Sequence, residues 1–171
     1  MKKYNVAGHV FAVEEGDRKL TMDQYLPFET SSGNPLFTLY VGNDCEDALV
    51  ERFCEETRQD DGDQTIISGT LVDGRKAFVY EWKRGKALLA CSADYTRATL
   101  YSDEGYLLHA VDNSLMLIFA LATANCATLL FHASTVVWQD KAFMFLGVSG
   151  TGKSTHSRLW LENIGGARLL N

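Results

Sequence analysis

One nine-residue stretch constrains this chain more than any other. Residues 147–155 read GVSGTGKST, which matches the phosphate-binding loop consensus G-x-x-x-x-G-K-[ST]. An apolar run precedes it at 142–146, and a stretch typical of a helix follows at 153–163, ended by two glycines. Strand, glycine-rich loop and helix form the order that this consensus requires, so we predict a mixed α/β arrangement around it.

The residue types of this stretch suit a phosphate ligand. Gly147, Gly150 and Gly152 permit positive φ angles and a close approach of the backbone. Successive N–H groups and the helix N-terminus then form an anion site. We expect Lys153 to contact the β- and γ-phosphates, and the Ser154 hydroxyl to ligate Mg²⁺. The alternative is an ordinary glycine turn before a helix that carries Lys and Ser.

Charge and composition exclude some classes of partner. The net charge is −6 and the 16 lysines and arginines are scattered, which argues against nucleic acid as the main partner. The chain of 171 residues is 46% apolar and 22% charged, as is ordinary for a soluble globular protein. The sequence leaves the oligomeric state open, a homo-oligomer included.

Cysteine usage and apolar runs predict a cytoplasmic location. Cys45, Cys54, Cys91 and Cys126 form no C-x-x-C pair, so we expect free thiols in a reducing compartment. The N-terminus lacks the apolar core of a signal peptide. Residues 114–137 are mostly apolar, and we interpret them as a buried helix and then a buried strand, with no membrane partner.

Residues 1–104 are expected to form an antiparallel, meander-like β domain with no catalytic constellation. Its best hairpin has Asp73 and Gly74 at the turn. The expected strands are 4–13, 36–41, 65–72, 76–82, 87–91 and 97–101. Residues 44–58 are acidic and ambiguous, with a short helix as one reading. The acidic run 60–63 lacks the spacing of a calcium loop, so we interpret it as a solvated loop.

Residues 105–171 are expected to form a nucleotide-binding α/β segment. A helix from 114 to about 127, capped by Asp112 or Asn113, precedes a strand at 131–138 and the strand that leads to the loop. Only 16 residues follow Thr155, too few to complete an α/β sheet around the loop. We therefore expect the segment to be truncated at its C-terminus and the chain to be a fragment or a shortened homologue of a longer protein.

The run HASTVVWQDKAFMFLGVSGTGKST, residues 132–155, resembles the nucleotide site shared by HPr serine kinase/phosphorylase and phosphoenolpyruvate carboxykinase. The resemblance implies a phosphoenolpyruvate carboxykinase-like core and a phosphotransferase that uses ATP and Mg²⁺, with a protein serine as acceptor. It implies that His132 faces the phosphates; the residues alone leave a core histidine bonded to backbone as the other reading. The expected phosphate-binding residues are Gly147, Ser149, Gly150, Thr151, Gly152, Lys153, Ser154 and Thr155, with Lys153 and His132 catalytic.

One departure from both families keeps alternatives open. Both families place an acidic pair on the strand after the loop's helix, but no Asp or Glu follows Glu162 here. A phosphoryl-transfer site without an acid has no obvious base and an incomplete metal shell. The resemblance also leaves a carboxykinase, which would act on oxaloacetate, as one alternative. The missing acidic pair leaves a nucleotide-binding regulatory module without catalysis as the other. The sequence does not distinguish adenine from guanine.

Overall fold

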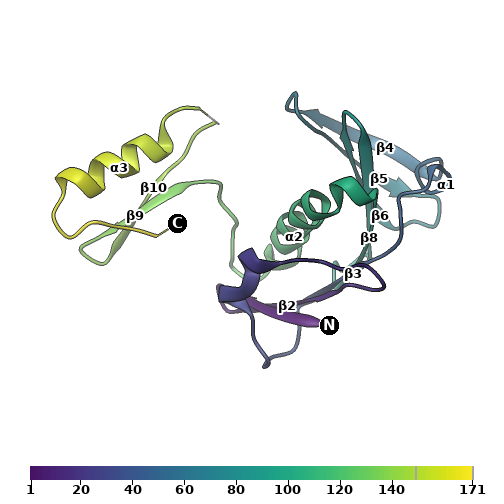
Figure 1. Cartoon of the computed structure of the whole chain (residues 1–171), viewed down its shortest axis with the longest axis horizontal. Coiled ribbons are helices and arrows are strands. Elements are labelled where there is room, and N and C mark those ends of the chain that lie inside the picture. Colours follow the sequence, from purple (N-terminus) through teal and green to yellow (C-terminus); the bar gives the residue numbers. More distant parts are fainter. Residues whose placement is uncertain (149, 171) are drawn as a thin grey trace. The chain divides into compact units, whose positions relative to one another are not determined.

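The computed structural model describes residues 1–148 and 150–170 and has a mixed α/β fold. The chain divides into two compact units, Met1–Leu129 and Leu130–Asn171 (Figure 1). The first unit contains a large sheet and a central helix. The second contains a three-stranded sheet, a helix and the loop that matches the phosphate-binding consensus.

The sheet of the first unit has eight strands in the order β1-β2-β3-β8-β7-β6-β5-β4. Their bounds are β1 Lys2–Val6, β2 His9–Glu14, β3 Phe37–Val41, β4 Phe53–Asp60, β5 Thr65–Leu71, β6 Lys76–Trp82, β7 Gly85–Cys91 and β8 Arg97–Ser102. The hairpin of β5 and β6 confirms the expected turn at Asp73 and Gly74. Gly74 has a φ of 86°, which a residue with a side chain adopts only at a cost in strain.

The N-terminal strand expected over 4–13 is in fact two strands. β1 and β2 form a hairpin in which Val6 pairs with His9. Ala7 and Gly8 make the turn, with φ angles of 51° and 85°. Two successive left-handed residues are typical of the type I′ turns that join adjacent antiparallel strands. The Ala-Gly pair is a weaker turn signal than Asn-Gly, which explains why the pattern resembled one strand.

The expectation of a purely antiparallel meander was wrong at β3. This strand runs parallel to both neighbours, with Phe37 beside Phe11 of β2 and Thr38 beside Arg97 of β8. A parallel pair needs a crossover rather than a tight turn. Residues 15–36 supply that crossover and include the short 3₁₀ helix η1 (Asp23–Phe28).

The ambiguous acidic segment forms a short helix and an edge strand. α1 (Asp47–Val50) precedes β4, whose residues are exposed apart from a half-buried Phe53. β4 is the last strand of the sheet. Charged side chains on such a strand oppose pairing with other chains, and they also remove the apolar alternation by which a strand is recognised in a sequence.

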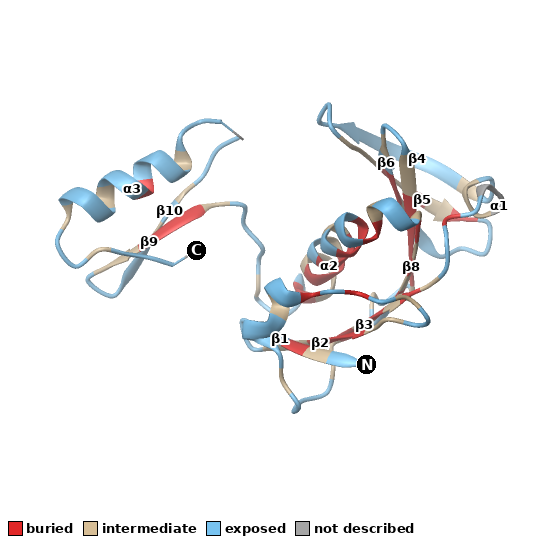
Figure 2. Cartoon of the chain, in the orientation of Figure 1, coloured by how far each residue is buried: buried red, intermediate tan, exposed pale blue. Residues whose placement is uncertain are grey.

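The central helix α2 (Leu107–Thr123) follows the short η2 (Glu104–Tyr106) and packs in the same core as β3, β7 and β8 (Figures 1 and 2). It begins seven residues before the expected start at 114, because Leu107, Ala110 and Val111 already face the core. Asp112 and Asn113 therefore lie inside the helix rather than at its cap. Because α2 completes the core of the sheet, the units divide at Leu129 rather than near residue 104.

One helical segment of the described residues, Glu104–Thr123, is long and apolar enough to cross a membrane by length and composition. Its buried residues include Leu115, Ile118 and Phe119, and they pack against the sheet of the first unit. The expected buried helix is therefore found, although its bounds differ.

The second unit has the sheet order β10-β9-β11, formed by β9 (Ser134–Trp138), β10 (Lys141–Phe145) and β11 (Arg168–Leu169). β9 pairs antiparallel with both neighbours. α3 (Lys153–Asn163) packs on this sheet through Trp160, whose ring lies 4.9 Å from that of Phe143. The bounds of α3 confirm the helix expected at 153–163, and β10 lies within one residue of the expected strand.

Candidate phosphate-binding site

The consensus loop joins the end of β10 to the start of α3 (Figure 1). Its described residues 146–148 and 150–152 are exposed. Ser149, which we expected to contact phosphate, lies outside the described residues. The loop therefore has the strand before it and the helix after it that the consensus requires.

Three glycines of the loop hold positions that a larger residue would disturb. Gly152 is the residue before α3 and has a φ of 88°, in the left-handed region. Gly147 has a φ of 152°, and a Cβ atom there would lie 2.7 Å from the Thr151 hydroxyl oxygen. Gly150 is also left-handed, with a φ of 82°. The glycine spacing thus permits the loop to turn sharply and to close on Thr151.

The Lys153 side chain turns back over the loop. Its Nζ atom donates hydrogen bonds to the carbonyl oxygens of Gly147 at 2.9 Å and Val148 at 3.1 Å. The Val148 oxygen also accepts a hydrogen bond of 2.9 Å from the Thr151 hydroxyl. Backbone carbonyl groups of the loop therefore fix the position of the ammonium group, and none of the ion pairs described in the chain involves it.

Backbone amides at the start of α3 supply further donors. The helix's first i to i−4 bond runs from the His156 N–H to the Gly152 carbonyl, at 2.9 Å. The N–H groups of Lys153, Ser154 and Thr155 precede that bond and have no partner within the helix. The side chains of Ser154 and Thr155 are exposed. An anion at this end would meet oriented N–H groups and the positive end of the helix dipole.

The position of His132 follows from the strand pairing. Ser134 at the start of β9 pairs with Phe145 at the end of β10. Because the strands are antiparallel, residues before Ser134 and residues after Phe145 leave the sheet at the same end. His132 lies two residues before Ser134, and Gly147 lies two residues after Phe145. His132 is thus at the same end of the sheet as the loop, and its side chain is exposed rather than buried.

The helix that carries Lys153 is anchored by contacts that the sequence pattern did not reveal. Ser157 is buried, and its hydroxyl lies 2.6 Å from that of Ser134 on β9. The Trp160 indole N–H donates to the His156 ring at 3.2 Å, and the His156 ring lies 4.5 Å from that of Phe145. Small hydroxyl residues on a strand and a helix carry no periodic signal, so only the fold brings them together.

The oxygen donors around the loop decide whether the Mg²⁺ implied by the resemblance fits. In proteins Mg²⁺ is usually bound by one or two carboxylates together with substrate phosphates and water. Ser154 offers one hydroxyl, whereas Asp140 lies in the turn between β9 and β10 and Glu162 in the last turn of α3. No group of three His, Cys, Asp or Glu residues in the described part of the chain is placed to hold a metal ion. The described carboxylates of this unit therefore lie away from Ser154, the residue expected to ligate Mg²⁺.

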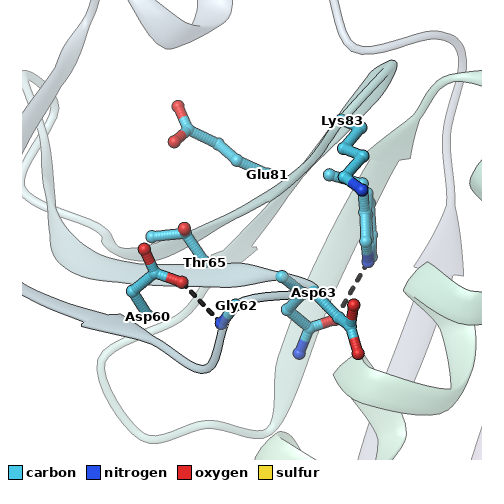
Figure 3. A pocket seen from close by; sticks show the side chains of 8 residues that line it. Asp60, Gly62, Asp63, Thr65, Glu81 and Lys83 are labelled. Atoms are coloured by element: carbon cyan, nitrogen blue, oxygen red, sulfur yellow. Dashed lines mark hydrogen bonds between the residues drawn. The ribbon is translucent and has the colours of Figure 1, made fainter.

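The first unit has an acidic pocket of about 250 Å³ beside the turn that joins β4 and β5 (Figure 3). Asp60, Asp63 and Glu81 contribute carboxylates to its lining. Asp60 accepts the Gly62 N–H at 2.8 Å, and Glu81 pairs with Arg58 at 3.2 Å. These bonds stabilise the turn and the edge strand, which agrees with the interpretation of 60–63 as a solvated loop.

Comparisons with protein-family models, with curated proteins and with solved structures found no match to this chain.

Proposed function

We propose that this chain binds ATP or another nucleoside triphosphate at the 147–155 loop. The observation that carries the proposal is the placement of the Lys153 ammonium, bonded to Gly147 and Val148, beside the first turn of α3. A cation and several oriented N–H groups at one loop suit a chain of phosphate groups. The consensus, its strand and its helix support the same conclusion.

We further propose that the protein catalyses phosphoryl transfer of the HPr kinase type, with a protein serine hydroxyl as acceptor. We propose the cytoplasm as its location. Lys153 would hold the phosphate chain and offset negative charge as it develops on the transferring group. His132, at the same end of the sheet, would face the phosphates. The support for this step is the resemblance of residues 132–155 together with the strand register that brings His132 and Gly147 to one end.

A second candidate is a nucleotide-binding regulatory module that does not catalyse transfer. The positions of Asp140 and Glu162, both away from the loop, favour it, because a kinase site uses a carboxylate to orient the acceptor hydroxyl or the metal. Transfer of labelled phosphate from ATP to serine-containing acceptor proteins distinguishes the two candidates. Turnover that requires oxaloacetate would instead indicate a carboxykinase.

Direct binding of ATP to the full chain tests the proposal. Isothermal titration of the wild type should give a saturable signal. Lys153→Ala should weaken binding about 10- to 100-fold, because it removes a charge-assisted contact. Lys141→Ala is the matched control, since Lys141 is an exposed lysine at the opposite end of β10. Equal affinities for the wild type and Lys153→Ala would contradict the proposed role of the loop.

A further inference from the structure

The charges of the second unit are unevenly placed with respect to the loop. Residues 130–171 contain four lysines and arginines and two carboxylates. Asp140 is separated from the loop by the five residues of β10, about 17 Å of extended chain. Glu162 lies eight residues after Ser154 in α3, a rise of about 12 Å, and pairs with Arg158 at 3.8 Å. Neither carboxylate is within reach of a metal ion at Ser154.

Lys153 supplies the positive charge at the loop. Its ammonium is fixed by the carbonyl oxygens of Gly147 and Val148, so the positive charge is in place before a ligand arrives. The N–H groups of the first turn of α3 add to it. The negative charge of a phosphate chain that enters this site is therefore offset by the Lys153 ammonium and these N–H groups.

Resting on the proposed nucleotide binding, we infer that the loop binds the polyphosphate chain without a metal ion and that Mg²⁺ does not strengthen its affinity for ATP. Free ATP carries more negative charge than its magnesium complex. Lys153 and the helix N-terminus therefore attract the free form at least as strongly. The ligand class is a nucleoside triphosphate or an inorganic polyphosphate without bound metal.

Titration of the full chain with ATP, once in EDTA and once in millimolar MgCl₂, tests the inference. We expect a dissociation constant in EDTA equal to or below that in Mg²⁺. We also expect inorganic tripolyphosphate in EDTA to compete with ATP. Lys153→Ala should weaken binding in both buffers, and Lys141→Ala in neither, with circular dichroism to confirm that each variant is folded.

The outcomes separate the inference from the proposal on which it rests. Binding that is about tenfold tighter in Mg²⁺, or detectable only there, would overturn the inference and leave nucleotide binding standing. Absence of ATP binding in both buffers would overturn both. Failure of tripolyphosphate to compete would show that the base and sugar, rather than the phosphate chain, determine affinity, which also contradicts the inference.

Discussion

The Ser157 hydroxyl lies 2.6 Å from the Ser134 hydroxyl and 3.3 Å from the Lys153 carbonyl oxygen. A hydroxyl group has one proton to donate. If Ser157 donates to the Lys153 carbonyl, Ser134 donates to Ser157. Strand β9 is in this way linked, through two buried side chains, to the residue that begins α3 and carries the candidate phosphate-binding cation.

This relationship predicts the effect of removing one hydroxyl. Ser157→Ala leaves Ser134 with a buried hydroxyl that has lost its acceptor, and should lower the free energy of unfolding by about 1–3 kcal/mol. The Ser134→Ala and Ser157→Ala double variant should lose less than the sum of the single changes, because no unpaired hydroxyl remains. Denaturant unfolding followed by tryptophan fluorescence measures all three. Strictly additive losses would show that the two hydroxyls are not coupled.

Gly85 is predicted to tolerate no side chain. A Cβ atom at this position would lie 2.2 Å from the Tyr106 ring, which stacks on Trp82 with centroids 5.0 Å apart. Gly85→Ala must displace that ring, so we expect a loss of about 1–3 kcal/mol in the free energy of unfolding.

The matched control for Gly85 is Gly105→Ala. A Cβ atom at Gly105 would meet no described atom within 4 Å, and its φ is not positive. Gly105→Ala should change the free energy of unfolding by no more than about 0.5 kcal/mol, measured by thermal unfolding. Equal losses of stability in the two alanine variants would contradict the prediction that the Tyr106 ring excludes a side chain at position 85.

Arg18 joins three separate segments of the first unit. Its guanidinium donates to the Ser102 carbonyl at 2.6 Å and pairs with Glu104 at 2.8 Å and with Asp44. The Arg18 side chain is only 12% exposed, so we expect Arg18→Ala to lower the free energy of unfolding by about 1.5–3 kcal/mol.

Arg75→Ala provides the comparison for Arg18. Arg75 pairs at 2.8 Å with Asp73, two residues away, and both side chains are substantially exposed. Such surface pairs contribute about 0–1 kcal/mol. Urea unfolding of both variants measures the difference, and an Arg18→Ala loss as small as that of Arg75→Ala would mean that the three contacts are not stabilising.

The four thiols should differ in reactivity. Burial raises the pKa of the Cys91 thiol to about 12, and Cys45 is also buried, whereas Cys54 and Cys126 are exposed. Because the thiolate is the reactive form, iodoacetamide at pH 8 should modify the two exposed thiols of the folded chain and all four after unfolding. Mass spectrometry of digests locates the modified residues. Rapid modification of Cys91 in the folded chain would contradict the packing of β7.

The same burial sets the sign of a pH effect. The folded-state pKa of Cys91 lies above the value of about 8.5 for an unfolded thiol. The neutral thiol therefore contributes its full stability below about pH 8.5, and that contribution is lost progressively as the pH rises toward about 12. A Cys91→Ala variant should show a shallower loss of stability over this range.

The parts of the fold that local signals determine could be predicted from the sequence. α3 begins after the left-handed Gly152 and ends before Gly165, so its bounds follow from the two glycine signals. The hairpin at Asp73 and Gly74 follows from its turn in the same way. The loop of the candidate site lies between elements of this kind, which is why its placement could be predicted.

The remainder depends on contacts that no local pattern contains. The pairing of Thr38 with Arg97 joins strands far apart in the chain, and nothing in β3 specifies its direction. β4 is exposed on nearly every residue, so it lacks the alternation of a half-buried strand. The link between Ser134 and Ser157 likewise exists only once α3 lies on the sheet.

The position of α2 has a consequence for synthesis on the ribosome. The core of the first unit includes Leu115, Ile118 and Phe119, so its sheet lacks its apolar cover until residues up to about 123 have left the exit tunnel. Translation adds residues at about 5–20 per second, and domains generally fold as units with the N-terminal one first. The nascent eight strands therefore pass through an interval in which their apolar face is open to chaperones, and the phosphate-binding loop emerges only after that interval has ended.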